Sequence, residues 1–176
     1  MSKTALIVVD MVNSYDHPDA ERLTECVEKV LPTIAEVIDG WDGPTIYVND
    51  NFGHWRSNRD DLLETALTGE FRALVEPIAP KDDAMFVVKA RHSIFFQTPL
   101  EYLLGQEKID RIMLVGQVTE QCILYSALDA YIRHFEVAVP CDATACIHEH
   151  LAKAALEMME LNMDADTSPA SDIKLA

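Results

Sequence analysis

The stretch Thr4-Ala-Leu-Ile-Val-Val9-Asp10 decides the fold. It is a short apolar run, rich in β-branched residues, that ends at an acidic side chain, which is typical of a β-strand. Similar runs recur, with long helix-compatible stretches between most of them, at Thr45–Val48, Met85–Val88, Arg111–Val115 and Glu136–Val139. Such alternation predicts parallel strands joined by crossover helices. We therefore predict an α/β protein with one open parallel sheet and helices on both faces.

Apolar residues at three-and-four spacing mark helices between these strands. One such stripe runs from Leu23 to Ile38, and Pro32 is expected to bend this helix without ending it. Further stripes begin at Ile123 and at Leu151, after the fourth and fifth apolar runs. Each stripe gives a helix one face that packs on the sheet.

Length and charge limit the possible functions. The chain has 176 residues, with 14 Lys plus Arg against 30 Asp plus Glu, and a formal charge of −16. We assign a single domain to residues 1–163 and a flexible tail to residues 164–176, where large apolar residues are scarce. A protein with this much negative charge repels the phosphate backbone of nucleic acids and anionic lipids. We therefore expect no nucleic-acid and no membrane partner. The first apolar run is too short for a secretory signal, and we expect a cytoplasmic protein.

The sequence carries no clear motif for a metal or a cofactor. The segment Cys141-x4-Cys146-x-His148-x-His150 lacks a paired CxxC, and we do not assign zinc to it. No GxGxxG follows an apolar run and no GxxxxGK[ST] occurs, so the phosphate-binding loops of dinucleotide and P-loop sites are missing. We expect no cofactor, and we expect all four cysteines to be reduced thiols.

Reactive side chains follow several of the predicted strands. These are Asp10, Asn49-Asp50, Lys89, the segment Thr119–Cys122 and Asp142. Because ligands gather beyond the carboxyl ends of parallel strands, an acid, a base and a thiol are expected to meet there. A lysine beside a thiol favours the thiolate, and a carboxylate beside it can carry the proton. Taken singly, each residue also suits a structural role, as a cap or a core side chain.

Three segments resemble the signature blocks of the isochorismatase-like cysteine hydrolases. They are Asp10-Met-Val-Asn13-Ser-Tyr15, Lys89-Ala-Arg91-His-Ser93-Ile-Phe95-Phe-Gln-Thr98-Pro-Leu100 and Gly116-Gln-Val118-Thr119-Glu-Gln-Cys122. The resemblance covers roughly residues 4 to 160 and implies the Rossmann-like fold of that family. It places the catalytic triad on Asp10, Lys89 and Cys122. It also implies a cis peptide between Gln117 and Val118, with an oxyanion hole formed by the amides of Val118 and Cys122.

The resemblance implies hydrolysis of a C–N bond in a small amide through a Cys122 thioester. Three alternatives stay open. The family's vinyl-ether hydrolases usually lack the cysteine, which argues against that branch. Its nicotinamidases bind a divalent metal through an Asp-x-His element, but here Phe52 replaces the first histidine in Asp50-Asn51-Phe52-Gly53-His54. We predict no bound metal, although Asp50, His54 and His92 are conceivable ligands, and a non-catalytic ligand-binding relative is the third alternative.

Pocket residues and assembly are expected largely from the resemblance. Tyr15 stands where the family has an aromatic wall, and Phe95 follows the Lys89 block. We assign these two residues, together with Asp50, Trp55 and Thr119, to contacts with a small-molecule amide substrate. We also expect a homodimer or homotetramer, as in relatives, because the apolar helix faces after Cys122 exceed what one sheet face covers.

Overall fold

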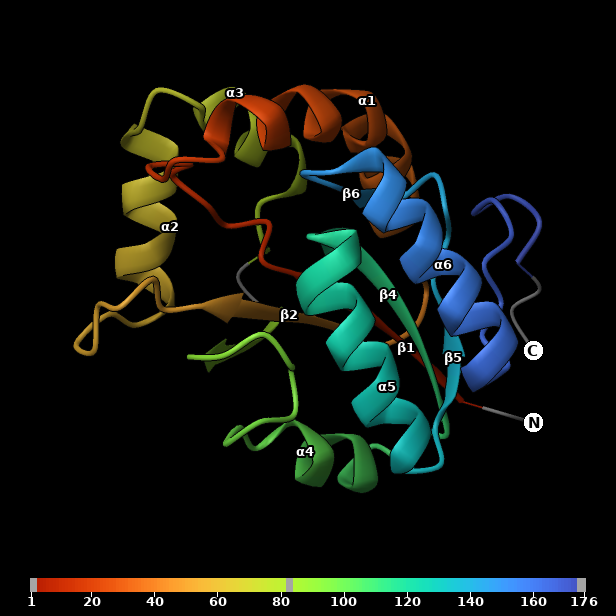
Figure 1. Ribbon diagram of the computed structural model, residues 1–176. Coiled ribbons are helices and arrows are strands. Elements are labelled where there is room, and N and C mark those ends of the chain that lie inside the picture. The colour runs from red at the N-terminus through yellow and green to blue at the C-terminus, as the bar shows by residue number, and fades with distance from the viewer. Residues whose placement is uncertain (1–2, 82–83, 174–176) are drawn as a thin grey trace.

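The central element is a six-stranded parallel sheet, seen in a computed structural model that describes residues 3–81 and 84–173 (Figure 1). The strand order is β3-β2-β1-β4-β5, with β6 also paired to β4. The strands are β1 (Thr4–Val9), β2 (Thr45–Asp50), β3 (Met85–Lys89), β4 (Arg111–Gln117), β5 (Glu136–Ala138) and β6 (Thr144–Ala145). The open parallel sheet is confirmed, and each apolar run became a strand. Only β6 was not predicted, because two residues show no periodicity.

Helices cover both faces of the sheet, as predicted. The helical elements are α1 (Ala20–Asp39), α2 (Arg59–Thr68), α3 (Arg72–Val75), η1 (Glu76–Ile78), α4 (Leu100–Gln106), η2 (Thr119–Ile123), α5 (Leu124–Ile132) and α6 (Glu149–Met163). Figure 1 shows α5 and α6 lying next to each other across one face. No helix among the described residues has both the length and the apolar content to cross a membrane.

Two apolar cores, one on each face, hold the layers together. Alternate residues of β1 serve the two sides, so Ile7 packs with α4, α5 and α6, whereas Leu6 and Val8 pack with α1, α2 and α3. The middle of β1 is therefore an unbroken apolar run from Ala5 to Val9, as is typical of parallel strands covered on both faces. This packing fixes where the strands end, and hence where the polar residues after them meet.

The longest helix, α1, continues through Pro32. A proline in a helix interior removes one backbone donor and favours a bend, yet the flanking apolar residues Val27 and Ile34 are fully buried against the sheet. The helix ends at Gly40, whose backbone N–H donates to the carbonyl of Glu36 at 2.9 Å. Tertiary packing thus outweighs the local cost of the proline.

Residues 164–173 differ from the flexible tail that the sequence predicted. The backbone N–H of Asp166 donates to Val137 at 3.0 Å, and that of Val139 donates to Asp166 at 2.8 Å, so the chain returns to the sheet beside β5. The side chains of Ala165 and Ile173 are buried. Two isolated apolar residues leave no periodic signal, and this is why composition indicated a loose segment. The end of the predicted tail, residues 174–176, lies outside the described residues.

Candidate active site

The strand order brings Asp10, Lys89 and Cys122 to one end of the sheet. Asp10 follows β1, and Lys89 ends β3, where it is in register with Asp50 at the end of β2. Cys122 lies in η2, immediately after β4, whose Gly116 is in register with Val9. Residues separated by 112 positions of sequence therefore share one site, because neighbouring parallel strands end together.

The ammonium of Lys89 is the centre of this site. Its Nζ lies 2.8 Å from Asp10 Oδ2, 3.4 Å from Asp50 Oδ2 and 3.5 Å from Cys122 Sγ. The Lys89 side chain has 0% exposure, and that of Asp10 has 8%. A buried cation is costly unless it is paired and hydrogen-bonded, and the three acceptors match the three donors of an ammonium.

Backbone contacts hold Asp10 in position. Its φ is 55°, in the left-handed region that aspartate tolerates better than most residues. Its Oδ1 accepts the backbone N–H of Asp50 at 2.7 Å, and its carbonyl accepts Gln117 Nε2 at 2.6 Å. Asp10 therefore presents one carboxylate oxygen to Lys89 while the other is held by the neighbouring strand.

Burial and charge shift the acid and the base in ways that suit proton transfer. Burial raises the pKa of Asp10, and the Lys89 ammonium offsets only part of that rise. Burial alone lowers the pKa of Lys89, but interactions with Asp10, Cys122 and Asp50 outweigh it and raise the pKa overall. Lys89 consequently stays an ammonium, and Asp10 is a stronger base than an exposed carboxylate.

Burial and the neighbouring charges act in opposite directions on the thiol of Cys122. Burial raises the pKa of Cys122, and the negative charge of Asp10 raises it further, so that the lowering effect of Lys89 does not prevail. A raised pKa favours the protonated thiol. Its proton has an acceptor at hand, because Asp10 forms a side-chain hydrogen bond with it.

A compact turn carries the nucleophile. The peptide between Gln117 and Val118 is cis, at the position that the resemblance implies. The backbone N–H groups of Gln121 and Ile123 both donate to the carbonyl of Val118, at 3.0 and 3.1 Å, which closes the single wide turn of η2. Val118 and Cys122, the residues predicted to form an oxyanion hole, both line the cavity described next.

A cavity of about 290 Å³ opens beside the thiol. Its walls are Asp10, Asn13, His17, Asp19, Leu23, Asp50, Phe52, His92, Gln117, Val118, Gln121, Cys122 and Ile147. His92 was foreseen only as a conceivable metal ligand, yet its Nδ1 lies 3.5 Å from Cys122 Sγ. Gln121 is adjacent to Cys122 in the third family-like segment, and this adjacency could have identified it as a cavity residue. His17 and Asp19 carried no signal, because they precede a helix in a loop.

Two of the five predicted substrate contacts lie at cavities on this end of the sheet. Asp50 lines the cavity beside Cys122. Trp55 is 77% exposed and lines an adjoining cavity of about 460 Å³ that also includes Lys89 and Arg91.

The other three predicted contacts are buried and line neither of these cavities. Tyr15 is buried against Phe71, and its hydroxyl donates to Gln117 Oε1 at 3.4 Å, so it supports the turn from behind. Phe95 is buried and stacks on Phe135. Thr119 is buried and donates its hydroxyl to the carbonyl of Ala145 at 3.0 Å. Apolar residues beside a strand end serve a core as readily as a pocket wall, and here the core takes them.

The residues at the nicotinamidase-like position do not fit a divalent metal. Within residues 3–81 and 84–173, no group of three His, Cys, Asp or Glu side chains is arranged to hold one. Both Asp50 oxygens are occupied, Oδ1 by the backbone N–H of Phe52 at 2.7 Å and Oδ2 by Lys89. His54 lines the adjoining cavity, whereas His92 contacts the thiol.

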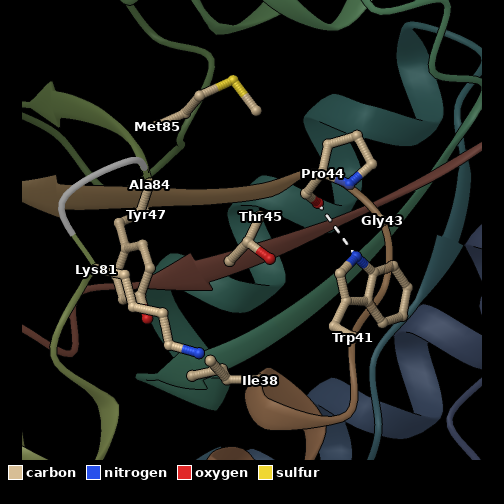
Figure 2. A pocket seen from close by; sticks show the side chains of 9 residues that line it. All are labelled: Ile38, Trp41, Gly43, Pro44, Thr45, Tyr47, Lys81, Ala84 and Met85. Atoms are coloured by element: carbon tan, nitrogen blue, oxygen red, sulfur yellow. Dashed lines mark hydrogen bonds between the residues drawn. The ribbon is translucent and has the colours of Figure 1, made fainter.

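A further cavity, of about 330 Å³, lies at the opposite end of the sheet (Figure 2). It is bordered by Thr45 and Met85, the first residues of β2 and β3, and by Trp41, whose indole N–H donates to the carbonyl of Pro44 at 3.2 Å. Its cation, Lys81, pairs with Asp39 at 3.7 Å, but both side chains are 74% exposed. Solvent therefore screens the charges there, and we assign no chemistry to this cavity.

Known proteins are similar to this chain over nearly its whole length. The Isochorismatase domain family matches residues 4–170. YaaI of Bacillus subtilis, an uncharacterized isochorismatase family protein, is 30% identical over 178 residues, covering 98% of each chain. Nicotinamidase 3 of Arabidopsis thaliana is 27% identical, covering 86% of this chain and 78% of its own. The crystal structure of N-carbamoylsarcosine amidase from Thermoplasma acidophilum matches with a TM-score of 0.66 at 25% identity, covering 98% of this chain and 99% of that one. The chain belongs to the isochorismatase family of hydrolases.

Proposed function

We propose that this protein hydrolyses the C–N bond of a small amide, with Cys122 as nucleophile, Asp10 as proton carrier and Lys89 as electrostatic support. One observation carries the proposal: a fully buried ammonium lies within 3.5 Å of a carboxylate and of a thiol that both line a cavity. A purely structural site has no need to bury that charge beside a thiol.

The first half of the reaction forms a thioester. Asp10 accepts the Cys122 proton as Sγ attacks the carbonyl carbon of the amide, and the negative charge moves to the carbonyl oxygen. The backbone N–H groups of Val118 and Cys122 are the proposed donors to that oxygen, a contribution worth about 3 kcal/mol per donor. Lys89 stabilises the sulfur as it becomes anionic. Asp10 then protonates the departing nitrogen, and the C–N bond breaks.

The second half restores the thiol. Asp10, again a carboxylate, takes a proton from a water molecule that attacks the thioester carbon. The C–S bond breaks as the tetrahedral intermediate collapses, and Asp10 returns its proton to Cys122 Sγ. The products are a carboxylic acid and ammonia or an amine. The raised pKa of Asp10 supports this double role, since its basicity is greater than that of an exposed aspartate.

The charge of the cavity favours an uncharged substrate over an anionic one. Three carboxylates, Asp10, Asp19 and Asp50, line it, and the Lys89 ammonium beside the thiol already pairs with two of them. We propose that Asp50 and the adjoining Trp55 contact the part of the substrate away from the scissile bond. An amide without a carboxylate group is expected to show a higher kcat/KM than the same amide carrying one.

A panel of small amides, ureas and imides, with ammonia release as readout, tests the function. The wild type is expected to hydrolyse at least one member, and Cys122→Ala is expected to hydrolyse none. Isochorismate is assayed separately by pyruvate release, because its hydrolysis frees no ammonia. Attack of water on a vinyl ether survives loss of the thiol, whereas thioester chemistry does not. Binding of panel members without turnover by the wild type would contradict the proposal and favour a non-catalytic relative.

We further propose that the protein assembles as a homodimer or homotetramer. The adjacent helices α5 and α6 expose large apolar side chains, at Tyr125, Leu128, Tyr131, Ile132, Leu151, Met158 and Leu161. Several large apolar side chains exposed on two adjacent helices are typical of a subunit contact. Sedimentation velocity of the wild type and of Leu161→Glu tests this assignment, and a wild type that sediments as a monomer would contradict it.

A further inference from the structure

Two cysteines outside the proposed triad lie in contact with each other. Cys26 is on α1 and Cys146 directly follows β6, and their sulfur atoms are 3.3 Å apart although 120 positions separate them in sequence. Both are free thiols in the structure. A disulfide has a sulfur–sulfur length of about 2.05 Å, so bond formation requires an approach of only about 1.2 Å.

The surroundings of the two sulfurs give them different roles. Cys26 is only partly buried, and its sulfur accepts the backbone N–H of Cys146 at 3.0 Å. Because Cys26 is the less buried of the two, we assign it the role of the attacking sulfur. Cys146 is buried, and burial together with Cys26 raises its pKa to about 12, so it keeps its proton until a partner is in place.

We propose that Cys26 and Cys146 are a redox modification site that closes to an intrachain disulfide, with a low-molecular-weight disulfide such as oxidised glutathione as the oxidant. The Cys26 thiolate attacks one glutathione sulfur, which forms a mixed disulfide and releases one glutathione thiolate. Cys146 then attacks the Cys26 sulfur, loses its proton to solvent and releases the second glutathione. The two protein thiols are oxidised by two electrons, and the glutathione disulfide is reduced to two thiols.

The residues that follow Cys146 connect this pair to η2, the turn that carries Cys122. The next residue, Ile147, lines the cavity beside Cys122. The backbone N–H groups of Ile147 and His148 donate to Glu120 Oε1, at 3.1 and 2.7 Å, and Glu120 belongs to η2. A bond to Cys26 therefore ties α1 to the segment that holds the turn of Cys122.

Equilibration of the folded full-length protein in glutathione buffers of rising oxidised fraction tests the proposal. Samples are quenched in acid, alkylated, weighed as intact chains and mapped as peptides. The expected product has lost the mass of two hydrogens and contains a Cys26–Cys146 linked peptide, which disappears on addition of dithiothreitol. Unfolded protein in concentrated guanidinium chloride is expected to lose this preference for one pairing, because the proximity belongs to the fold.

Two variants complete the test. Cys26→Ser is expected to abolish the linked peptide, whereas Cys141→Ser, a change at an exposed cysteine outside the pair, is expected to leave its yield unchanged. Circular dichroism confirms that both variants are folded. The proposal is overturned if wild-type Cys26 stops at the glutathione mixed disulfide, or if no Cys26–Cys146 peptide forms at any buffer ratio. Neither outcome depends on amide hydrolysis, so this inference stands or falls apart from the proposed function.

Discussion

The two ends of the sheet carry cavities of similar size, but the ion pair at one end is exposed to solvent and the pair at the other is buried. At the amino end, Lys81 and Asp39 form an ion pair in which both side chains are 74% exposed, beside a cavity of about 330 Å³. At the carboxyl end, Lys89 and Asp10 form a pair with exposures of 0% and 8%, beside a cavity of about 290 Å³. The difference supports the proposal that desolvated charge next to a thiol, rather than cavity volume, marks the reactive end of this molecule.

The largest effect is expected from removal of the nucleophile. Cys122→Ala is expected to lower kcat/KM by about 10⁴-fold or more, because no other group can form the thioester. Cys141→Ala, at an exposed thiol, is expected to leave it unchanged. Ammonia release measures both. If Cys122→Ala kept an activity within tenfold of the wild type, the assignment of Cys122 as the nucleophile would be wrong.

The next effect concerns the two lysines. Lys89→Met leaves the buried Asp10 carboxylate without its cation, and a cost of about 3–5 kcal/mol in the free energy of unfolding is expected, together with a loss of activity of at least about 10²-fold. Lys81→Met, at the exposed pair, is expected to cost less than about 1 kcal/mol. Urea unfolding monitored by fluorescence gives both values. Equal costs would contradict the contrast between the two ends.

Glycines at the two ends offer a third contrast. Gly116 has a φ of 116°, and a Cβ there would lie 2.2 Å from the carbonyl oxygen of Val9, next to Asp10. Gly116→Ala is expected to cost about 3 kcal/mol in stability and to displace the acid. A Cβ on Gly43 meets mainly the Trp41 indole at 2.7 Å, which is a side chain free to shift, so Gly43→Ala is expected to cost less. Thermal melts compare them, and a smaller loss at Gly116 would refute the close approach.

The smallest effect is a shift in pH dependence. Activity requires the Asp10 carboxylate, so kcat/KM falls as the pH drops through the Asp10 pKa, which lies above its ordinary value of 3.8. The negative charge of Asp50 contributes to that rise. Asp50→Asn is therefore expected to move the acidic limb to lower pH, whereas Asp19→Asn, which also lines the cavity, is expected to leave it in place. A limb that moved to higher pH in Asp50→Asn would reverse the assigned sign.

The sequence predicted the strands well because burial on two faces demands unbroken apolar runs, as in β1. It predicted that Asp10, Lys89 and Cys122 meet, because strand ends converge in a parallel sheet whatever the intervening chain does. It could not decide whether Tyr15 and Phe95 line the substrate pocket or pack in the core, since an aromatic ring beside a strand end suits either position. It also could not show how strongly burial opposes Lys89 at Cys122, because the depth of burial has no counterpart in residue order.

The sealed position of Lys89 has a consequence for the conditions under which the site works. Mobile ions weaken attractions between charges that they can surround, and at physiological salt this screening acts over about 8 Å. They can surround Lys81 and Asp39, but the Lys89 side chain touches no solvent. The field that Lys89 exerts on Asp10 and Cys122 is thus insulated from the ionic strength of the medium, although the surface around it carries a large negative charge.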